Sequence, residues 1–209
     1  MSIAAQTKET QANISPSQAV ELLKDGNQRF VQKKGLNRDF HQQIAETAEG
    51  QYPFAAVVSC IDSRIPTEVV FDQGIGDIFN ARVAGNIVNP DILGSLEFAC
   101  KLAGAKAIIV MGHTGCGAVK GACDSAELGN LTQMLDKIKP AVDLIPTLQG
   151  EARNSGNEGF VNKVADKNVE LTIENMKSQS AVLKEMNDNG EITIVGAMYD
   201  VKTGEITFS

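Results

Sequence analysis

Residues 77–112 read DIFNARVAGNIVNPDILGSLEFACKLAGAKAIIVMG and decide the fold. The runs DIFNAR (77–82) and KAIIVMG (106–112) are short and apolar, which is typical of strands covered on both faces of a sheet. Between them, Pro90 can open a helix and Gly104 can end it. A strand, a crossover helix and a second strand form a parallel unit. We therefore expect an α/β fold with a mainly parallel central sheet flanked by helices.

The flanking sequence extends this pattern in both directions. FAAVVS (54–59) is a third apolar strand, and EITIVGAMYDVKTGEITFS (191–209) is expected to form a C-terminal hairpin that turns at KTG (202–204). Ser15 and Pro16 are a helix start, so residues 1–14 are expected to be a polar arm before a helix. Further helices are predicted over 38–50, 128–149 and 157–188, with a loop over 149–159.

Length and composition limit the class of protein. A chain of 209 residues suits one domain over 1–209, with an N-terminal arm and helices in 1–50 and the α/β core in 51–209, although its length also allows two very small domains. The formal net charge of -7 disfavours a nucleic-acid partner. No apolar run is long enough for a membrane helix, and the first residues lack the pattern of a secretory signal. We expect a cytoplasmic protein without a membrane partner.

Residues with metal-binding chemistry follow two of the predicted strands. Cys60 comes directly after FAAVVS, and His113 follows KAIIVMG with Cys116 three residues later in a glycine-rich turn. Carboxyl ends of neighbouring parallel strands meet at one edge of the sheet, so these side chains can converge. Two thiolates and one imidazole suit Zn²⁺, and three protein ligands leave the fourth tetrahedral position open, as in catalytic sites.

Simpler interpretations apply to each residue alone. A lone cysteine is usually buried, and a His-x-x-Cys pair by itself is a weak signal. Asp62 and Arg64 can form a surface ion pair, which contributes about 0–1 kcal/mol. The glycine-rich turn GHTGCGAVKG lacks the ending of a phosphate-binding loop. Because both halves of the constellation fall at predicted strand ends, we favour a metal site.

The motifs in combination identify a family. CIDSR (60–64), GDIFNARVAGN (76–86), GSLEFA (94–99) and GHTGCGAVKGA (112–122) resemble the β-class carbonic anhydrases. The resemblance runs from about Gln51 to Ala122 and resumes more weakly at GAMYDVKTGEITF (196–208). It implies a zinc enzyme that interconverts CO2 and bicarbonate, built on a mainly parallel sheet and assembled as a homodimer or a dimer-based oligomer.

The same resemblance implies roles for individual residues. Its zinc ligands would be Cys60, His113 and Cys116, with Asp62 and Arg64 as the catalytic dyad beside them. Substrate-pocket positions of the plant-like subclass match Gln51 and Phe79, and Phe98 stands where that subclass often has Tyr. Together with Phe79 and Phe98, backbone groups at Gly115 and Gly117 are expected to line a narrow pocket, with Gln51 donating to a bicarbonate oxygen; core packing is the alternative for both aromatic rings.

A regulatory bicarbonate pocket found in another branch of the family is not expected. That pocket uses a Trp three residues before the first cysteine ligand, where this chain has Val57, and the chain contains no Trp. Arg82 still matches an arginine of that pocket.

The ligand set also predicts how the site works. Zinc lowers the pKa of a bound water, an effect for which carbonic anhydrase with three neutral histidines is a standard example. Two thiolates would cancel the charge of the metal, so we expect weaker acidification and activity that rises with alkaline pH. Asp62, kept ionised by Arg64, can accept a hydrogen bond and orient the nucleophile. Released from Arg64, it could instead occupy the fourth metal position in a closed, inactive form.

Two other functions remain open from the sequence. One is a related zinc hydrolase acting on carbonyl sulfide or carbon disulfide; the other is a non-enzymatic zinc or thiol sensor. His41 is expected to be a solvated helix position rather than a proton shuttle. Cys100 and Cys123 are expected to be buried thiols outside the site.

Overall fold

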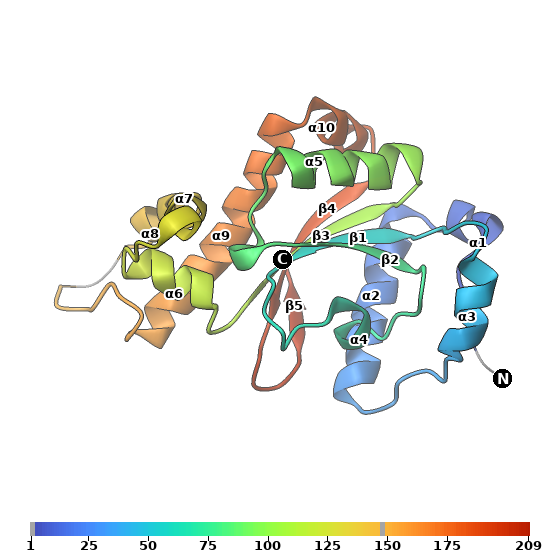
Figure 1. The fold of residues 1–209 in the computed structure, drawn as a ribbon, viewed down its shortest axis with the longest axis horizontal. Coiled ribbons are helices and arrows are strands. Elements are labelled where there is room, and N and C mark those ends of the chain that lie inside the picture. Colours follow the sequence, from blue (N-terminus) through green and yellow to red (C-terminus); the bar gives the residue numbers. More distant parts are fainter. Residues whose placement is uncertain (1–2, 147–148) are drawn as a thin grey trace.

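The computed structural model of the protein describes residues 3–146 and 149–209 and is built on a five-stranded sheet in the order β2-β1-β3-β4-β5 (Figure 1). Neighbouring strands among the first four are parallel, and β5 runs antiparallel to β4. The predicted parallel sheet and C-terminal hairpin are therefore confirmed. The strands are β1 (Ala55–Ser59), β2 (Ile78–Arg82), β3 (Ala107–His113), β4 (Thr193–Tyr199) and β5 (Ile206–Phe208).

Helices cover both faces of the sheet. On one face lie α5, the π-helical turn η2 and α10, while α2, α4, α6 and α8 lie on the other; α9 packs against both β3 and β4 (Figure 1). The helical segments are α1 (Lys8–Ala12), α2 (Pro16–Val31), α3 (Phe40–Thr47), α4 (Thr67–Val70), the 3₁₀ turn η1 (Ala84–Asn86), α5 (Pro90–Glu97), η2 (Phe98–Leu102), α6 (Gly117–Cys123), α7 (Gly129–Asp136), α8 (Lys139–Leu144), α9 (Glu158–Gln179) and α10 (Ala181–Asp188).

The two central strands are buried on both faces, as their apolar sequences predict. In β1, Ala55 and Val57 point into one hydrophobic cluster, and Ala56 and Val58 into the other. All seven residues of β3 are likewise buried. Alternate side chains of a strand face opposite sides of the sheet, so an unbroken apolar run is what a strand between two helical layers requires.

Several boundaries differ from the sequence-based prediction. The strand β2 is at the edge of the sheet and is only partly buried, so the expectation of cover on both faces is wrong for it. The predicted polar arm contains α1, which Thr7 caps. The helix predicted over 128–149 is two short helices, α7 and α8, and its residues 147–148 lie outside the described part of the chain.

The helix predicted over 157–188 is also divided. Ser180 leaves the helical conformation between α9 and α10, and its hydroxyl accepts a hydrogen bond from the Leu183 amide. The same hydroxyl donates to Glu97 at 2.6 Å. A serine that caps a helix start satisfies an amide that has no partner within the helix, so the break is stabilised by the residue that makes it.

A buried amide side chain connects α2 to the C-terminal hairpin of the sheet. Asn27 on α2 donates to the carbonyl oxygens of Val70 and Gly204 at 3.0 and 2.9 Å, and it accepts from the Ile206 amide at 2.9 Å. One side chain thereby joins α2 to α4 and to the C-terminal hairpin.

In residues 3–146 and 149–209, no helix combines the length and the apolar character needed to cross a membrane.

Candidate metal centre

Three potential metal ligands converge where β1 and β3 end. Cys60 follows β1, His113 is the last residue of β3, and Cys116 lies in the turn before α6. One ligand atom from each side chain lies within 4.8 Å of the others, and all three residues are buried. Because β1 and β3 are parallel neighbours, with Ser59 paired to Met111, their carboxyl ends bring the two ligand segments together.

The imidazole of His113 is oriented as a metal ligand requires. Its Nδ1 lies 3.0 Å from the Thr114 carbonyl oxygen, which can only accept, so Nδ1 carries the proton. Its Nε2 is buried and has no hydrogen-bond partner. A buried polar atom without a partner is costly in a folded protein, and a cation beside it would remove that cost.

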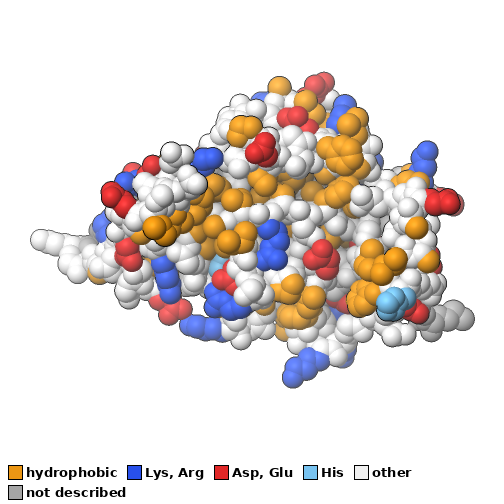
Figure 2. Space-filling model, in the orientation of Figure 1, with side chains coloured by type: hydrophobic (Ala, Val, Ile, Leu, Met, Phe, Trp, Pro, Cys, Tyr) orange, Lys and Arg blue, Asp and Glu red, His pale blue; other side chains and the backbone are white. Residues whose placement is uncertain are grey.

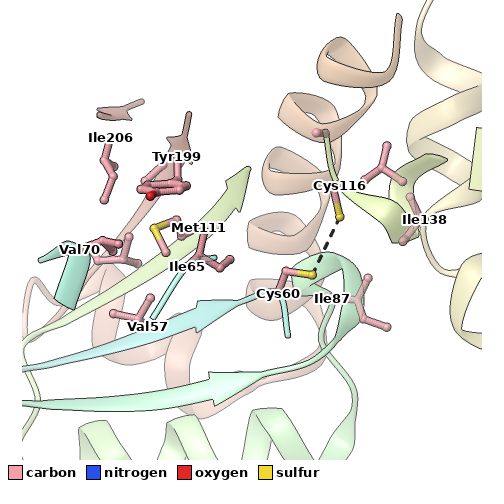
Figure 3. Packing of buried hydrophobic residues seen from close by; sticks show 14 of the residues in the cluster. Val57, Cys60, Ile65, Val70, Ile87, Met111, Cys116, Ile138, Tyr199 and Ile206 are labelled. Atoms are coloured by element: carbon pink, nitrogen blue, oxygen red, sulfur yellow. Dashed lines mark hydrogen bonds between the residues drawn. The ribbon is translucent and has the colours of Figure 1, made fainter. Parts of the chain in front are cut away.

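The two sulfur atoms are spaced for a tetrahedral ion. Cys60 Sγ and Cys116 Sγ are 4.0 Å apart and point toward each other at the end of the core, beside Ile87 and Ile138 (Figure 3). With Zn–S bonds of about 2.3 Å, two sulfurs of a tetrahedral site lie about 3.8 Å apart. The donor set and its spacing therefore fit zinc.

Hydrogen bonding favours thiolate at one of the two cysteines. The contact with Cys116 and hydrogen bonds from the amides of Gly85 and Asp62 lower the pKa of Cys60 to about 4, against the effect of burial. The same sulfur pair and burial raise the pKa of Cys116. Cys60 therefore loses its proton readily while Cys116 keeps its own. The thiolate is the form that binds metal.

An ion-paired carboxylate lies beside the ligand cluster. Arg64 Nε is 2.9 Å from Asp62 Oδ1, and its Nη2 is 2.6 Å from Oδ2. The Arg64 guanidinium holds the pKa of Asp62 well below its usual range. Asp62 Oδ2 is 3.9 Å from His113 Nε2, so the carboxylate faces the cluster while its charge is satisfied by Arg64.

Arg82 braces the backbone that carries these residues. Its Nε donates to the Cys60 carbonyl at 2.9 Å, and its Nη2 donates to the Asp62 carbonyl at 2.6 Å. The guanidinium at the end of β2 therefore fixes the loop after β1.

Comparison with known proteins places this centre in a family. The family model described as carbonic anhydrase matches residues 55–206, a span that contains all three potential ligands and the Asp62–Arg64 pair. The chain belongs to the carbonic anhydrase family. A carbonic anhydrase 2 from Mycobacterium tuberculosis is 32% identical over 200 residues, with 92% of each chain covered.

Solved carbonic anhydrase structures share the fold. The β-carbonic anhydrase CafA of Aspergillus fumigatus has a TM-score of 0.72 and 26% identity, covering 92% of this chain and 89% of that chain. A tetrameric β-carbonic anhydrase from Sordaria macrospora has a TM-score of 0.68 and 25% identity, with 79% and 84% covered. The predicted resemblance to the β class is confirmed, and neither a sulfur-substrate hydrolase nor a non-enzymatic sensor is favoured by these relatives.

Other residues assigned to the site of this carbonic anhydrase lie elsewhere on the chain. Gln51 is exposed and precedes β1, whereas Cys60 follows it. The five-residue strand between them spans about 16 Å at roughly 3.3 Å per residue. In contrast, Gly117 opens α6 next to Cys116, with nothing within 4 Å of the position that a Cβ would occupy.

Phe79 and Phe98, the two aromatic residues predicted to line the pocket, contact each other on the face of the sheet opposite to the cysteine sulfurs. The rings of Phe79 and Phe98 are 6.2 Å apart in an edge-to-face arrangement. They line a groove of about 600 Å³ between β2 and α5. Figure 2 shows hydrophobic side chains gathered in a band along α5 on this face. Within one chain, the structure does not bring these rings to the three potential metal ligands.

The remaining candidates match their simpler interpretations. His41 is exposed on α3. Cys100 and Cys123 are buried and belong to different hydrophobic clusters. Burial raises the pKa of Cys100 to about 12, which leaves it an unreactive thiol.

Sequence reasoning missed residues that support the ligand loops through the backbone. The Gly85 amide donates to Cys60 Sγ at 3.4 Å, and Asn168 donates to the Gly85 carbonyl at 2.8 Å. Asn162 accepts from the Gly115 amide at 3.2 Å. Both asparagines lie on α9, at least 40 positions after the end of GHTGCGAVKGA (112–122). No spacing rule links these asparagines to the cysteines. Of the residues in the contact to Cys60, only Gly85 lies within a recognised motif, GDIFNARVAGN.

Proposed function

We propose that this protein catalyses the reversible hydration of CO2 to bicarbonate and a proton, with Zn²⁺ held by Cys60, His113 and Cys116. The observation that carries the proposal is the convergence of three buried donor atoms beside an ion-paired carboxylate in a chain of the carbonic anhydrase family. Three protein ligands leave one tetrahedral position for a small reactant, which distinguishes a catalytic from a structural zinc site.

Zinc would supply the Lewis acidity that makes a water molecule nucleophilic near neutral pH. The roles of the chain's own groups follow from their geometry. Asp62 is ionised and can only accept, so it orients an O–H group next to His113 Nε2. Arg64 holds both carboxylate oxygens of Asp62, which keeps this side chain from occupying the fourth position itself.

The charge of the ligand set predicts the pH dependence. Two thiolates neutralise a divalent ion, whereas three histidines leave its full charge on the site. A less positive centre stabilises the deprotonated reactant less, so activity is expected to rise from pH 7 toward pH 9.

The direct test is stopped-flow CO2 hydration by metal-replete protein from pH 7 to 9. Asp62→Asn should lower the rate while zinc content stays at one ion per chain, because the variant loses the anionic acceptor but no ligand. Glu68→Gln, on the exposed surface of α4, is the matched control and should keep both. A rate equal to the buffer blank would contradict the activity; loss of zinc in Asp62→Asn would instead make Asp62 a structural fourth ligand.

We further propose that a second copy of the chain completes the substrate pocket. The supporting observation is that Gln51, Phe79 and Phe98 lie away from the metal cluster of their own chain. Phe98 is 53% exposed and faces a groove rather than the core. If these groups contact substrate, they do so in the site of a partner, and a two-fold dimer supplies such an exchange twice.

Subunit mixing tests this arrangement. Gln51→Ala and Asp62→Asn are each expected to reduce activity as pure proteins. When the two are co-expressed, half of the dimers are mixed, and each mixed dimer holds one intact site of two. Recovery of about a quarter of wild-type activity is then expected. If Gln51 serves its own chain, mixing restores nothing. Sedimentation of the wild type provides the oligomeric state directly.

A further inference from the structure

A buried asparagine on α9 is linked to one of the potential metal ligands by hydrogen bonds through a single intervening residue. Asn168 is 2% exposed, and its side-chain amide donates to the Gly85 carbonyl at 2.8 Å. The amide of that same glycine donates to Cys60 Sγ at 3.4 Å. Asn168 is thus connected to a ligand sulfur by two hydrogen bonds that share a single residue.

The Gly85 turn does not hold its shape through local preference alone. Gly85 has φ +74° and Asn86 has φ +44°, so two consecutive residues are in the left-handed region, which is unfavourable for a residue with a side chain. A Cβ on Gly85 would lie 2.5 Å from Ile138 Cδ1, so the turn is also tightly enclosed. Contacts from outside the turn must therefore fix the direction of its amide.

We propose that Asn168 is a positioning residue of the metal centre. By holding the Gly85 carbonyl it restrains the turn so that the Gly85 N–H points at the Cys60 sulfur. This N–H···S bond withdraws electron density from the thiolate and so increases the Lewis acidity of a bound ion. The inference rests on the proposed metal function, and outer-shell hydrogen bonds of this kind are known to tune ligands.

The test uses cobalt-loaded protein, because thiolate-to-Co²⁺ charge transfer reports the electron density on sulfur. Asn168→Leu removes the donor at similar volume, and Thr172→Val is the control. Thr172 lies one turn further along α9 and is 3% exposed, so it matches Asn168 in helix and burial. In Asn168→Leu the charge-transfer band should move to longer wavelength and Co²⁺ affinity should fall by about 10-fold. Thr172→Val should retain the wild-type band.

A purely structural role for Asn168 predicts a different result. Both variants would then lose thermal stability with identical Co²⁺ spectra, which would overturn the inference while leaving the proposed function intact. Absence of any thiolate band in wild-type protein supplied with Co²⁺ would overturn both the metal site and the inference.

A second measurement does not depend on a variant that folds. In wild-type protein loaded with ¹¹³Cd²⁺, a scalar coupling from the metal to the Gly85 amide proton is expected across the N–H···S bond. A ¹¹³Cd signal typical of two thiolates without that coupling would overturn the inference. The milder variant Asn168→Ser, with a shorter side chain, should weaken the coupling.

Discussion

Replacement of Gly85 by alanine is expected to destabilise the protein through two separable effects. The left-handed φ of +74° costs an alanine about 1 kcal/mol. The new Cβ would lie 2.5 Å from Ile138 Cδ1, and Ile138 is fully buried. Overpacking of this kind costs about 1–3 kcal/mol. The free energy of unfolding should therefore fall by about 2–4 kcal/mol, which a domain of ordinary stability survives.

A double-mutant cycle separates the two effects. Ile138→Val removes the Cδ1 atom and by itself costs about 0.5–1.5 kcal/mol. Combined with Gly85→Ala, it should restore the overlap part of the loss but not the part that comes from φ. The two changes should consequently be non-additive by about 1–3 kcal/mol. Urea denaturation of the four proteins, all with the same metal content, measures this difference.

A second glycine provides the control. Gly94 lies within α5, and apart from its chain neighbours and the backbone of its own helix no atom lies within 4 Å of where its Cβ would be placed. Gly94→Ala should be neutral or stabilising by up to about 1 kcal/mol, since alanine favours a helix. Additive effects of Gly85→Ala and Ile138→Val, or a Gly85→Ala protein as stable as Gly94→Ala, would refute the reasoning.

Three further changes test other parts of the structure. Burial disfavours the Asp72 carboxylate, but hydrogen bonds from Arg29 and Arg38 outweigh it and hold its pKa below the ordinary value. The stability that Asp72 contributes is thus present above the unfolded-state pKa of about 4 and is lost as the pH falls below it. Asp72→Asn should lower the free energy of unfolding by about 1–3 kcal/mol at pH 7. In urea denaturation below pH 4, the difference in stability between wild type and variant should be smaller. Asn27→Ala leaves three buried backbone groups unpaired and should cost about 2–4 kcal/mol by the same assay, whereas exposed Gln28→Ala should change little. Chelation of bound zinc should lower the unfolding free energy by about 4 kcal/mol relative to protein with free zinc at 1,000 times Kd, measured by calorimetry; an unchanged melting temperature would contradict metal binding to the folded state.

The fold was predictable where burial determines the sequence pattern. The strands β1 and β3 lie between two helical layers, and their uninterrupted apolar runs follow directly from that position. The edge strand β2 differs, because Asn80 and Arg82 interrupt its apolar residues and are exposed, while Ile78 and Phe79 pack against the core and α5 without full enclosure. The breaks within helices were harder to predict. Ser180 ends one amphipathic pattern by capping the next helix, and Pro140, which has no backbone N–H to donate, lies at the start of α8 after a second break. The spacing of apolar residues shows neither effect.

The three potential metal ligands were predictable because their chemistry is rare and their positions follow strand ends. The second layer of contacts was not, since Asn162 and Asn168 act on backbone groups of Gly115 and Gly85. An asparagine in a long helix has the same sequence signature whether it is solvated or buried against a turn. The separation of Gln51 from the cluster, in contrast, follows from the predicted strand over 54–59, which lies between Gln51 and Cys60. Only the resemblance to the family had assigned Gln51 to the pocket.

The convergence of the three potential ligands also depends on the register of the sheet. Cys60 and His113 are 53 positions apart (113 − 60), and each directly follows or ends a strand in the pair β1–β3. A slip of one residue between these strands would displace a ligand by about 3.3 Å and turn alternate side chains to the other face. Sulfur and nitrogen atoms that now lie within 4.8 Å could then not share one ion. An ion bound here would therefore stabilise only the native register, so the strand pairing that builds the site would in turn be held by its ligand.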